Sequence, residues 1–171
     1  MEAVAAAAQV STRTFFNYFP SKEDAVIGLR EPVLEDSMLE SFSLEIEPLR
    51  EVAHLTLAVL RSIHGGDDAV SCHTELLDLH PHLRQRRFHY VLKVEQLVTA
   101  AVAERLHGSR RWQGAIVAYP ADDVARMLVM VAGTASRYVM QKTAADPGRE
   151  SQFAALDDGL ALLRTVMAEL P

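Results

Sequence analysis

Val10–Glu23 has the sequence VSTRTFFNYFPSKE and follows an alanine-rich run. Serine is among the side chains that best cap the start of a helix, so we expect a helix to begin at Ser11. We expect that helix to end at Phe19, because Pro20 disfavours helical geometry in the residue before it. The stretch therefore predicts a short helix with a defined beginning and a defined stop.

Helices are also predicted on both sides of this one. Ser21 can cap the following helix, and Asp24 three residues later completes a serine-to-acid capping pattern. Residues 2–8 are strong helix formers, which leaves residues 9–10 as a turn. A helix, a tight turn, a second helix and a stop before a third form the layout of a helix-turn-helix unit that binds DNA.

The short helix has a composition suited to DNA. It carries no acidic residue between Ser11 and Pro20, so its free backbone N–H groups and positive dipole end can accept a phosphate. On its outer side, Arg13 could bind guanine, Asn17 adenine, and the edge of Phe16 a thymine methyl group. Thr12 lies on the same outer side.

An alternative is that the aromatic residues only form the core of a three-helix unit. Helical spacing places Val10, Phe15 and Phe19 on one side, and for the two phenylalanines we favour the core. For Phe16 we favour DNA readout. Tyr18 and Lys22 are placed to contact backbone phosphates.

Three segments carry a resemblance to a known family: VAAAAQVS at residues 4–11, TFFNYF at 14–19 and SKED at 21–24. Together they resemble the DNA-binding signature of the tetracycline-repressor (TetR) family. The resemblance implies an all-α homodimer with a helix-turn-helix domain, here residues 1–30. It also implies a larger ligand-binding and dimerisation domain, here residues 31–171.

By the same resemblance, residues 12–14, 16 and 17 fall where the family contacts base edges and nearby phosphates. Tyr18 and Lys22 fall where it contacts the backbone. With the resemblance, the predicted DNA-binding residues are Ser11, Thr12, Arg13, Thr14, Phe16, Asn17, Tyr18 and Lys22. The family has one further helix before the first one here, so that helix is expected to be missing from this chain. An internal methionine as the start, absent N-terminal residues and a real truncation all explain this, and we favour the first two.

Composition describes an ordinary soluble globular protein of 171 residues, 49% hydrophobic and 23% charged. We find no apolar run long enough to span a bilayer and no secretion signal, and one cysteine allows no internal disulfide framework. A cytoplasmic protein is therefore expected. The net charge of −6 argues mildly against nucleic acid, although the first thirty residues are balanced in charge.

The rest of the chain predicts further helices. Their expected ranges are 21–30, 33–42, 48–63, 69–79, 81–107, 122–142 and 150–169, with a possible turn of helix at 114–118. In the long helix from Pro81, the expected inward face carries Phe88, Val91, Leu92, Val98 and Val102.

The last two helices carry apolar residues at alternating three- and four-residue steps, which suits near-parallel helix packing. From the residues alone, these helices could equally complete the core of their own subunit. The resemblance favours a four-helix dimer bundle. The expected interface residues are Val124, Leu128, Val131, Ala135, Val139, Phe153, Leu156, Leu160, Leu163 and Met167.

Catalytic and metal sites are not indicated. Cys72-His73 and His80-Pro81-His82 lack the compact ligand spacing of a zinc site, and solvated surface positions explain them better. We find no serine elbow, phosphate loop or metalloprotease motif, so neither an enzyme nor a cofactor is predicted.

A ligand pocket is plausible between the helices of the larger domain, although each candidate is more often an ordinary core residue. The candidates are His54, His89, Tyr90, Trp112, Tyr119, Met127 and Met130. The function expected from the resemblance is a ligand-responsive transcriptional regulator, most often a repressor, on a palindromic operator. The alternative is a truncated ligand-binding or dimerisation protein without DNA binding.

Overall fold

A computed structural model of the chain describes residues 2–64, 74–143 and 148–170. Its helices are α1 (Glu2–Ala7), α2 (Thr12–Tyr18), α3 (Lys22–Val26), α4 (Asp36–Glu40), α5 (Pro48–Ser62), α6 (Thr74–Leu79), α7 (Pro81–Gly108), α8 (Gln113–Ala118), α9 (Ala121–Lys142) and α10 (Arg149–Ala168). Within the described ranges, the only extended pairing is an isolated bridge between Leu29 and His64. The predicted all-α class is confirmed.

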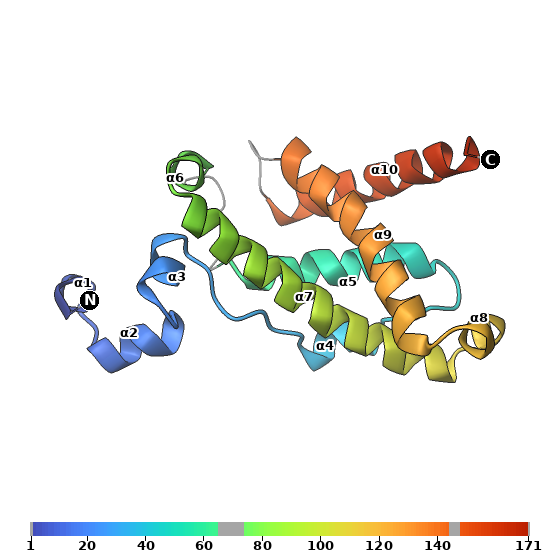
Figure 1. The fold of residues 1–171 in the computed structure, drawn as a ribbon, viewed down its shortest axis with the longest axis horizontal. Helices are drawn as coiled ribbons and strands as arrows, with labels where there is room; N and C mark the ends of the chain where they lie inside the picture. The colour runs from blue at the N-terminus through green and yellow to red at the C-terminus, as the bar shows by residue number, and fades with distance from the viewer. Residues whose placement is uncertain (1, 65–73, 144–147, 171) are drawn as a thin grey trace.

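Four helices form the body of the molecule. Helices α5 and α7 pack against each other, α9 packs on both of them, and α10 packs on α9 and α5. Figure 1 shows α1–α3 as a separate group at one end of this body, with α8 at the opposite end. Residues that are at most 1% exposed line the body's core, among them Val52, Leu57, Val94, Val98, Val129 and Leu156. No helix in the described part of the chain is long and apolar enough to cross a membrane.

The inward face of α7 differs from the prediction in its first half. Phe88 is 59% exposed and Leu92 is 37% exposed, whereas Tyr90 is fully buried. The N-terminal half of α7 carries large apolar residues all round, so spacing alone could not choose its inward face. Contacts with α3 and α9 settle that choice in the folded chain.

Helix α3 ends four residues earlier than predicted. Gly28 has a φ of 63°, and the N–H groups of Gly28 and Leu29 donate to the carbonyls of Ala25 (3.3 Å) and Asp24 (2.9 Å). These two hydrogen bonds around a residue with left-handed backbone geometry form the Schellman motif, which ends helices. The glycine was the signal in the sequence that marks this end.

A long connector, residues 30–47, joins α3 to α5. A helix over residues 33–42 was expected, but only Asp36–Glu40 is helical. The start of the connector is held extended along the end of α5, because the Arg30 N–H donates to the Ile63 carbonyl and the Val33 N–H donates to the Ser62 hydroxyl. Backbone groups engaged in this way cannot enter a helix.

Candidate DNA-binding interface

Side-chain and backbone caps fix both ends of α2. The Ser11 hydroxyl oxygen accepts a hydrogen bond from the Thr14 N–H (3.0 Å) and lies 2.7 Å from the Thr14 hydroxyl. At the other end, the Phe19 N–H donates to the Phe15 carbonyl (3.0 Å) before the chain turns at Pro20. A seven-residue helix is too short to be stable alone, so these caps and its packing must hold it.

The inner side of α2 packs on α1 through aromatic and small side chains. Phe15 is 7% exposed, and its ring centroid lies 5.6 Å from that of Phe16 and 5.8 Å from that of Phe19. Ala5 of α1 is 1% exposed. Val10, expected on this inner side, is 38% exposed because the turn between the helices carries it outward.

The outer side of α2 offers the side chains predicted to contact bases. Arg13 and Asn17 are exposed, Phe16 is 43% exposed, and no hydrogen bond or ion pair of Arg13 is found within the described residues. Thr12 and Thr14 are half-buried, and Ser11 is exposed but engaged as the helix cap. The arrangement leaves a guanidinium and a carboxamide free to donate and accept hydrogen bonds.

The rim of this surface is cationic. The Lys22 side chain is 70% exposed and makes only a loose contact of 3.8 Å with Glu23. Arg30 adds a charge that the sequence analysis missed: its guanidinium carbon lies 5.6 Å from the centre of the Tyr18 ring and 5.8 Å from that of Phe19. The turn at Gly28 brings Arg30 back to α2, which no helical spacing could have shown.

A buried ion pair anchors α3, the third of the candidate DNA-binding helices, to the body. Asp24 is 0% exposed, and its two carboxylate oxygens each accept a hydrogen bond of 2.7 Å from the Arg86 guanidinium of α7. The Ser21 hydroxyl donates to the same carboxylate (2.7 Å) and accepts from the Asp24 N–H (3.1 Å), so the predicted cap forms as well. A forked pair of this kind fixes orientation as well as distance.

The surroundings of Asp24 shift two pKa values. Burial raises the pKa of Asp24, but the hydrogen bonds from Arg86 and Ser21 outweigh it and leave the pKa below its ordinary value. Tyr90 is fully buried near this carboxylate. Burial, reinforced by the Asp24 charge, raises the pKa of Tyr90 to about 12.

The seven candidate ligand residues do not gather at one place. His54 contacts Asp157 (2.8 Å) between α5 and α10, while Tyr90 is buried beside α3. Trp112 donates to the Leu44 carbonyl (3.2 Å) and, with Met127, lines a shallow apolar hollow. The remaining three, His89, Tyr119 and Met130, are exposed on the surface.

The ten candidate interface residues divide into two groups. Ala135, Val139, Leu156 and Leu160 are at most 3% exposed within their own chain and therefore belong to its core. The six with exposed or half-buried side chains are Val124, Leu128, Val131, Phe153, Leu163 and Met167. An interface between copies would have to use this second group and its exposed neighbours.

Within the described residues, no group of three His, Cys, Asp or Glu side chains could hold a metal ion. Cys72 and His73 lie outside those residues. His80 and His82 are exposed, with ring centroids 5.7 Å apart.

The comparisons with known proteins agree with the geometry at the N-terminus. Residues 1–26, which include all of α1, α2 and α3, match the family model of bacterial regulatory proteins, tetR family. No curated protein and no solved structure matches the chain. The match supports the family inferred from the sequence, and it covers the N-terminal helix-turn-helix segment of the chain alone.

Proposed function

We propose that the chain is a DNA-binding transcriptional repressor that acts as a homodimer on a palindromic operator and is released by a small molecule. The exposure of Arg13 and Asn17 on a helix held inward by Phe15, inside the segment that matches the family model, carries the proposal. Residues 1–30 form the DNA-binding domain and residues 31–171 the ligand-binding and dimerisation domain. The protein works in the cytoplasm, is not an enzyme and needs no cofactor.

In the proposed complex, α2 of each subunit enters a major groove, and the two copies lie about 34 Å apart, one turn of the duplex. Arg13 and Asn17 read base edges, while Lys22 and Arg30 neutralise phosphates at the rim. Phosphate contacts supply affinity and salt dependence, whereas base contacts supply sequence preference.

The C-terminal half of α10 supports the proposed dimer. Its large apolar side chains have little cover from their own chain: Leu162 is 50% exposed, Val166 49% and Met167 55%. A run of apolar residues left open on a helix marks an interaction surface. A second copy of α10 would cover it in the bundle that we propose.

The test compares two single substitutions at the interface with DNA. Lys22→Ala should weaken binding to every DNA sequence and reduce the slope of log affinity against log salt by about 1. Asn17→Ala should cost about 1–3 kcal/mol on the preferred site alone and so relax the preference at one base pair. Fluorescence anisotropy on the gene's upstream region at several salt concentrations measures both effects.

Arg110→Ala is the matched control, because Arg110 is exposed in the turn between α7 and α8, and Figure 1 shows α8 at the opposite end of the body from α2. Its titrations should match those of the unchanged protein. If Lys22→Ala and Asn17→Ala affect every sequence equally, the assigned roles are wrong.

The net charge of −6 favours a second candidate, a ligand-binding or dimerisation protein without DNA binding. Absence of any salt-sensitive binding would favour that candidate.

A further inference from the structure

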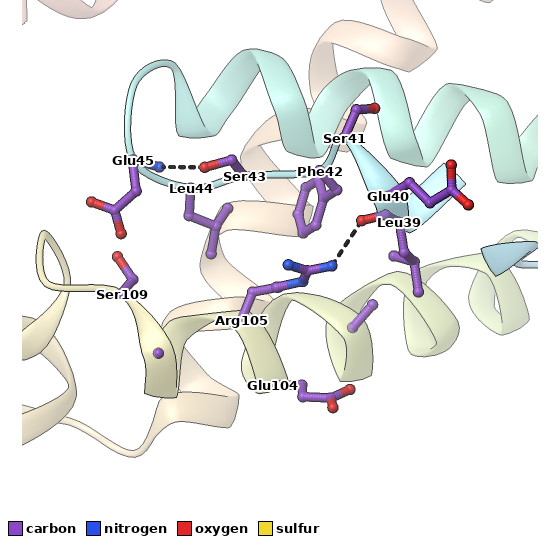
Figure 2. A pocket seen from close by; sticks show the side chains of 12 residues that line it. Leu39, Glu40, Ser41, Phe42, Ser43, Leu44, Glu45, Glu104, Arg105 and Ser109 are labelled. Carbon is purple, nitrogen blue, oxygen red and sulfur yellow. Dashed lines mark hydrogen bonds between the residues drawn. The ribbon is translucent and has the colours of Figure 1, made fainter. Parts of the chain in front are cut away.

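A hollow of about 690 Å³ lies between the connector and the C-terminal part of α7 (Figure 2). Its volume lies in the range of pockets that hold small organic molecules. It is half open to solvent on the outside of the body, and none of the seven residues considered above lines it. The lining residues are 39–45 on the connector side, with Ala101, Glu104, Arg105, Gly108 and Ser109 on the α7 side.

One buried polar group in this hollow lacks a partner. Ser109 is 4% exposed, and its hydroxyl oxygen makes no hydrogen bond within the described residues. A buried hydroxyl without a partner costs on the order of 1–3 kcal/mol, so such groups in folded proteins call for an explanation. A polar ligand in the hollow would supply the missing bond.

Two charged side chains of opposite sign also line the hollow without being paired to each other. Arg105 donates one hydrogen bond to the Leu39 carbonyl (2.7 Å), which leaves most of its five donors unused. The Glu45 carboxylate has no ion pair among the described residues. Figure 2 shows Glu45 and Ser109 at one end of the hollow and Arg105 further along α7, with Glu104 and Glu40 directed away from Arg105.

Apolar side chains separate the two charges. Phe42 and Leu44 are 4% and 2% exposed, and Figure 2 shows Leu44 between Glu45 and Arg105 and Phe42 next to the end of the Arg105 side chain. A ligand that pairs with Arg105, Glu45 and the Ser109 hydroxyl therefore has three parts. It needs an acid for Arg105, an amine for Glu45 and Ser109, and an apolar segment between them.

We propose that this hollow binds a small zwitterionic molecule whose acid and amine are separated by an apolar segment. The ligand's carboxylate lies against the Arg105 guanidinium, and its ammonium lies against the Glu45 carboxylate and the Ser109 hydroxyl.

Both walls of the hollow are connected to α3, so a ligand bound there could affect the position of the proposed DNA-binding helices. One wall belongs to the connector, which runs directly into α3, and the other belongs to α7, which holds Asp24 of α3 through Arg86. A ligand that joins Glu45 to Arg105 ties the connector to α7. This makes the hollow the effector site of the regulator; that part rests on the proposed function, whereas ligand binding itself does not.

The test uses γ-aminobutyrate and ε-aminocaproate as zwitterionic probes of two lengths, with hexanoate and hexylamine as analogues that each carry one charge. Calorimetry on the full chain without DNA should show binding of at least one zwitterion. Each singly charged analogue should bind about tenfold or more weakly than the zwitterion that binds better, because it leaves one charged group of the hollow unpaired. Equal binding of the zwitterions and the singly charged analogues, or no binding of any probe, overturns the proposal.

Substitutions assign the binding to this hollow. Arg105→Gln and Glu45→Gln should each weaken the bound zwitterion about tenfold, while Arg110→Gln and Glu150→Gln, exposed residues outside the lining, should leave it unchanged. Arg105→Lys keeps the charge and should retain part of the affinity, even if the loss of the Leu39 contact lowers stability. Unchanged affinity in Arg105→Gln or in Glu45→Gln overturns the site.

Ser109→Ala separates a binding role from a structural one. Because the Ser109 hydroxyl has no partner in the free protein, the substitution should leave the Tm unchanged or raise it, and yet weaken the zwitterion. A lowered Tm with unchanged affinity contradicts the proposal. DNA binding is measured separately, by anisotropy with operator DNA. If the unchanged protein binds a zwitterion but no operator DNA, the proposed function is wrong. If it binds operator DNA but no zwitterion, the proposed site is wrong.

Discussion

Asp24 shows how one residue can fix the position of α3, and with it the proposed DNA-binding helices, relative to α7. Its carboxylate is fully buried and yet receives three hydrogen bonds, one from Ser21 and two from Arg86. A buried carboxylate is tolerated only when it is paired in this way. The ion pair therefore makes the position of α3 depend on α7, because any displacement of α3 would leave the buried charge without Arg86.

The lowered pKa of Asp24 predicts an acid-sensitive contribution to stability. Because the pKa lies below its ordinary value of 3.8 in the folded chain, the carboxylate stabilises the fold above that pH. The contribution is lost as pH falls through the lowered pKa. In urea titrations from pH 7 down to about pH 3, the free energy of unfolding should fall more steeply for the unchanged protein than for Asp24→Asn.

Asp36→Asn is the control for this measurement, because Asp36 is exposed and makes no ion pair within the described residues. Its curve should run parallel to that of the unchanged protein. Parallel curves for Asp24→Asn as well would show that the ion pair makes no pH-dependent contribution.

Two residues with positive φ predict substitutions of opposite sign. Gln9 has a φ of 56°, where an L side chain is strained, and Gly28 has a φ of 63°. Gln9→Gly should therefore raise the free energy of unfolding by up to about 1 kcal/mol, and Gly28→Ala should lower it by about 1 kcal/mol. Thermal unfolding with hydrogen exchange of α1–α3 measures both, and a destabilised Gln9→Gly would show that the turn is not strained.

At the scale of elements, local signals in the sequence gave the helices their places. Serine caps predicted the starts of α2 and α3, and prolines predicted the starts of α5 and α7. Local signals could not predict contacts between residues that lie far apart in the sequence. Asp24 and Arg86 are 62 residues apart in the chain, and the inward face of α7 was fixed only by its contacts with α3 and α9.

The same limit applied to the sites. The outer side of α2 could be predicted because helical spacing and residue type lie within one helix. Arg30 was missed because a turn brings it back to α2, and the hollow lined by Ser109 was missed because its two walls lie about sixty residues apart in the sequence. A candidate list chosen by residue type could not show which side chains meet.

The contact between α3 and α7 predicts how DNA binding depends on orientation. Arg86→Ala should lower the free energy of unfolding by about 2 kcal/mol, less than for a fully buried pair because the Arg86 side chain is 36% exposed. It should also weaken DNA binding, although Arg86 belongs to the body, because α2 would no longer be held in a fixed direction. Arg86→Lys restores the charge without the fork and should give intermediate values.

Anisotropy and urea titrations on these two variants decide the question, with Arg84→Ala as the control. Arg84 pairs with Asp78 on the exposed surface at 3.1 Å, where such pairs contribute little. Unchanged DNA affinity in Arg86→Ala, with the expected loss of stability, would show that α3 keeps its orientation without α7.

At the scale of the whole molecule, α9 and α10 carry large apolar side chains that their own chain leaves exposed. Gly159 of α10 lies so close to Tyr138 of α9 that an added Cβ would stand 3.3 Å from its ring, so the two helices meet there. Tyr138 is 41% exposed, and Leu162 and Val166 follow Gly159 by one and two turns of α10. These side chains together are expected to form one apolar strip across both helices.

A second copy of the chain is the occupant that we predict for this strip. Leu162→Glu and Val166→Glu should each place a charge in the interface without touching the subunit core, because both side chains are about half exposed in the single chain. Both variants should therefore stay helical by circular dichroism but become monomeric in sedimentation equilibrium. Their affinity for a palindromic operator should fall about tenfold or more, because the second half-site no longer adds to the first.

Val117→Glu provides the control: Val117 is 84% exposed on α8, so its variant should remain dimeric and bind DNA normally. If the α10 variants remain dimeric as well, the interface lies elsewhere, and the apolar end of α10 must contact a different partner.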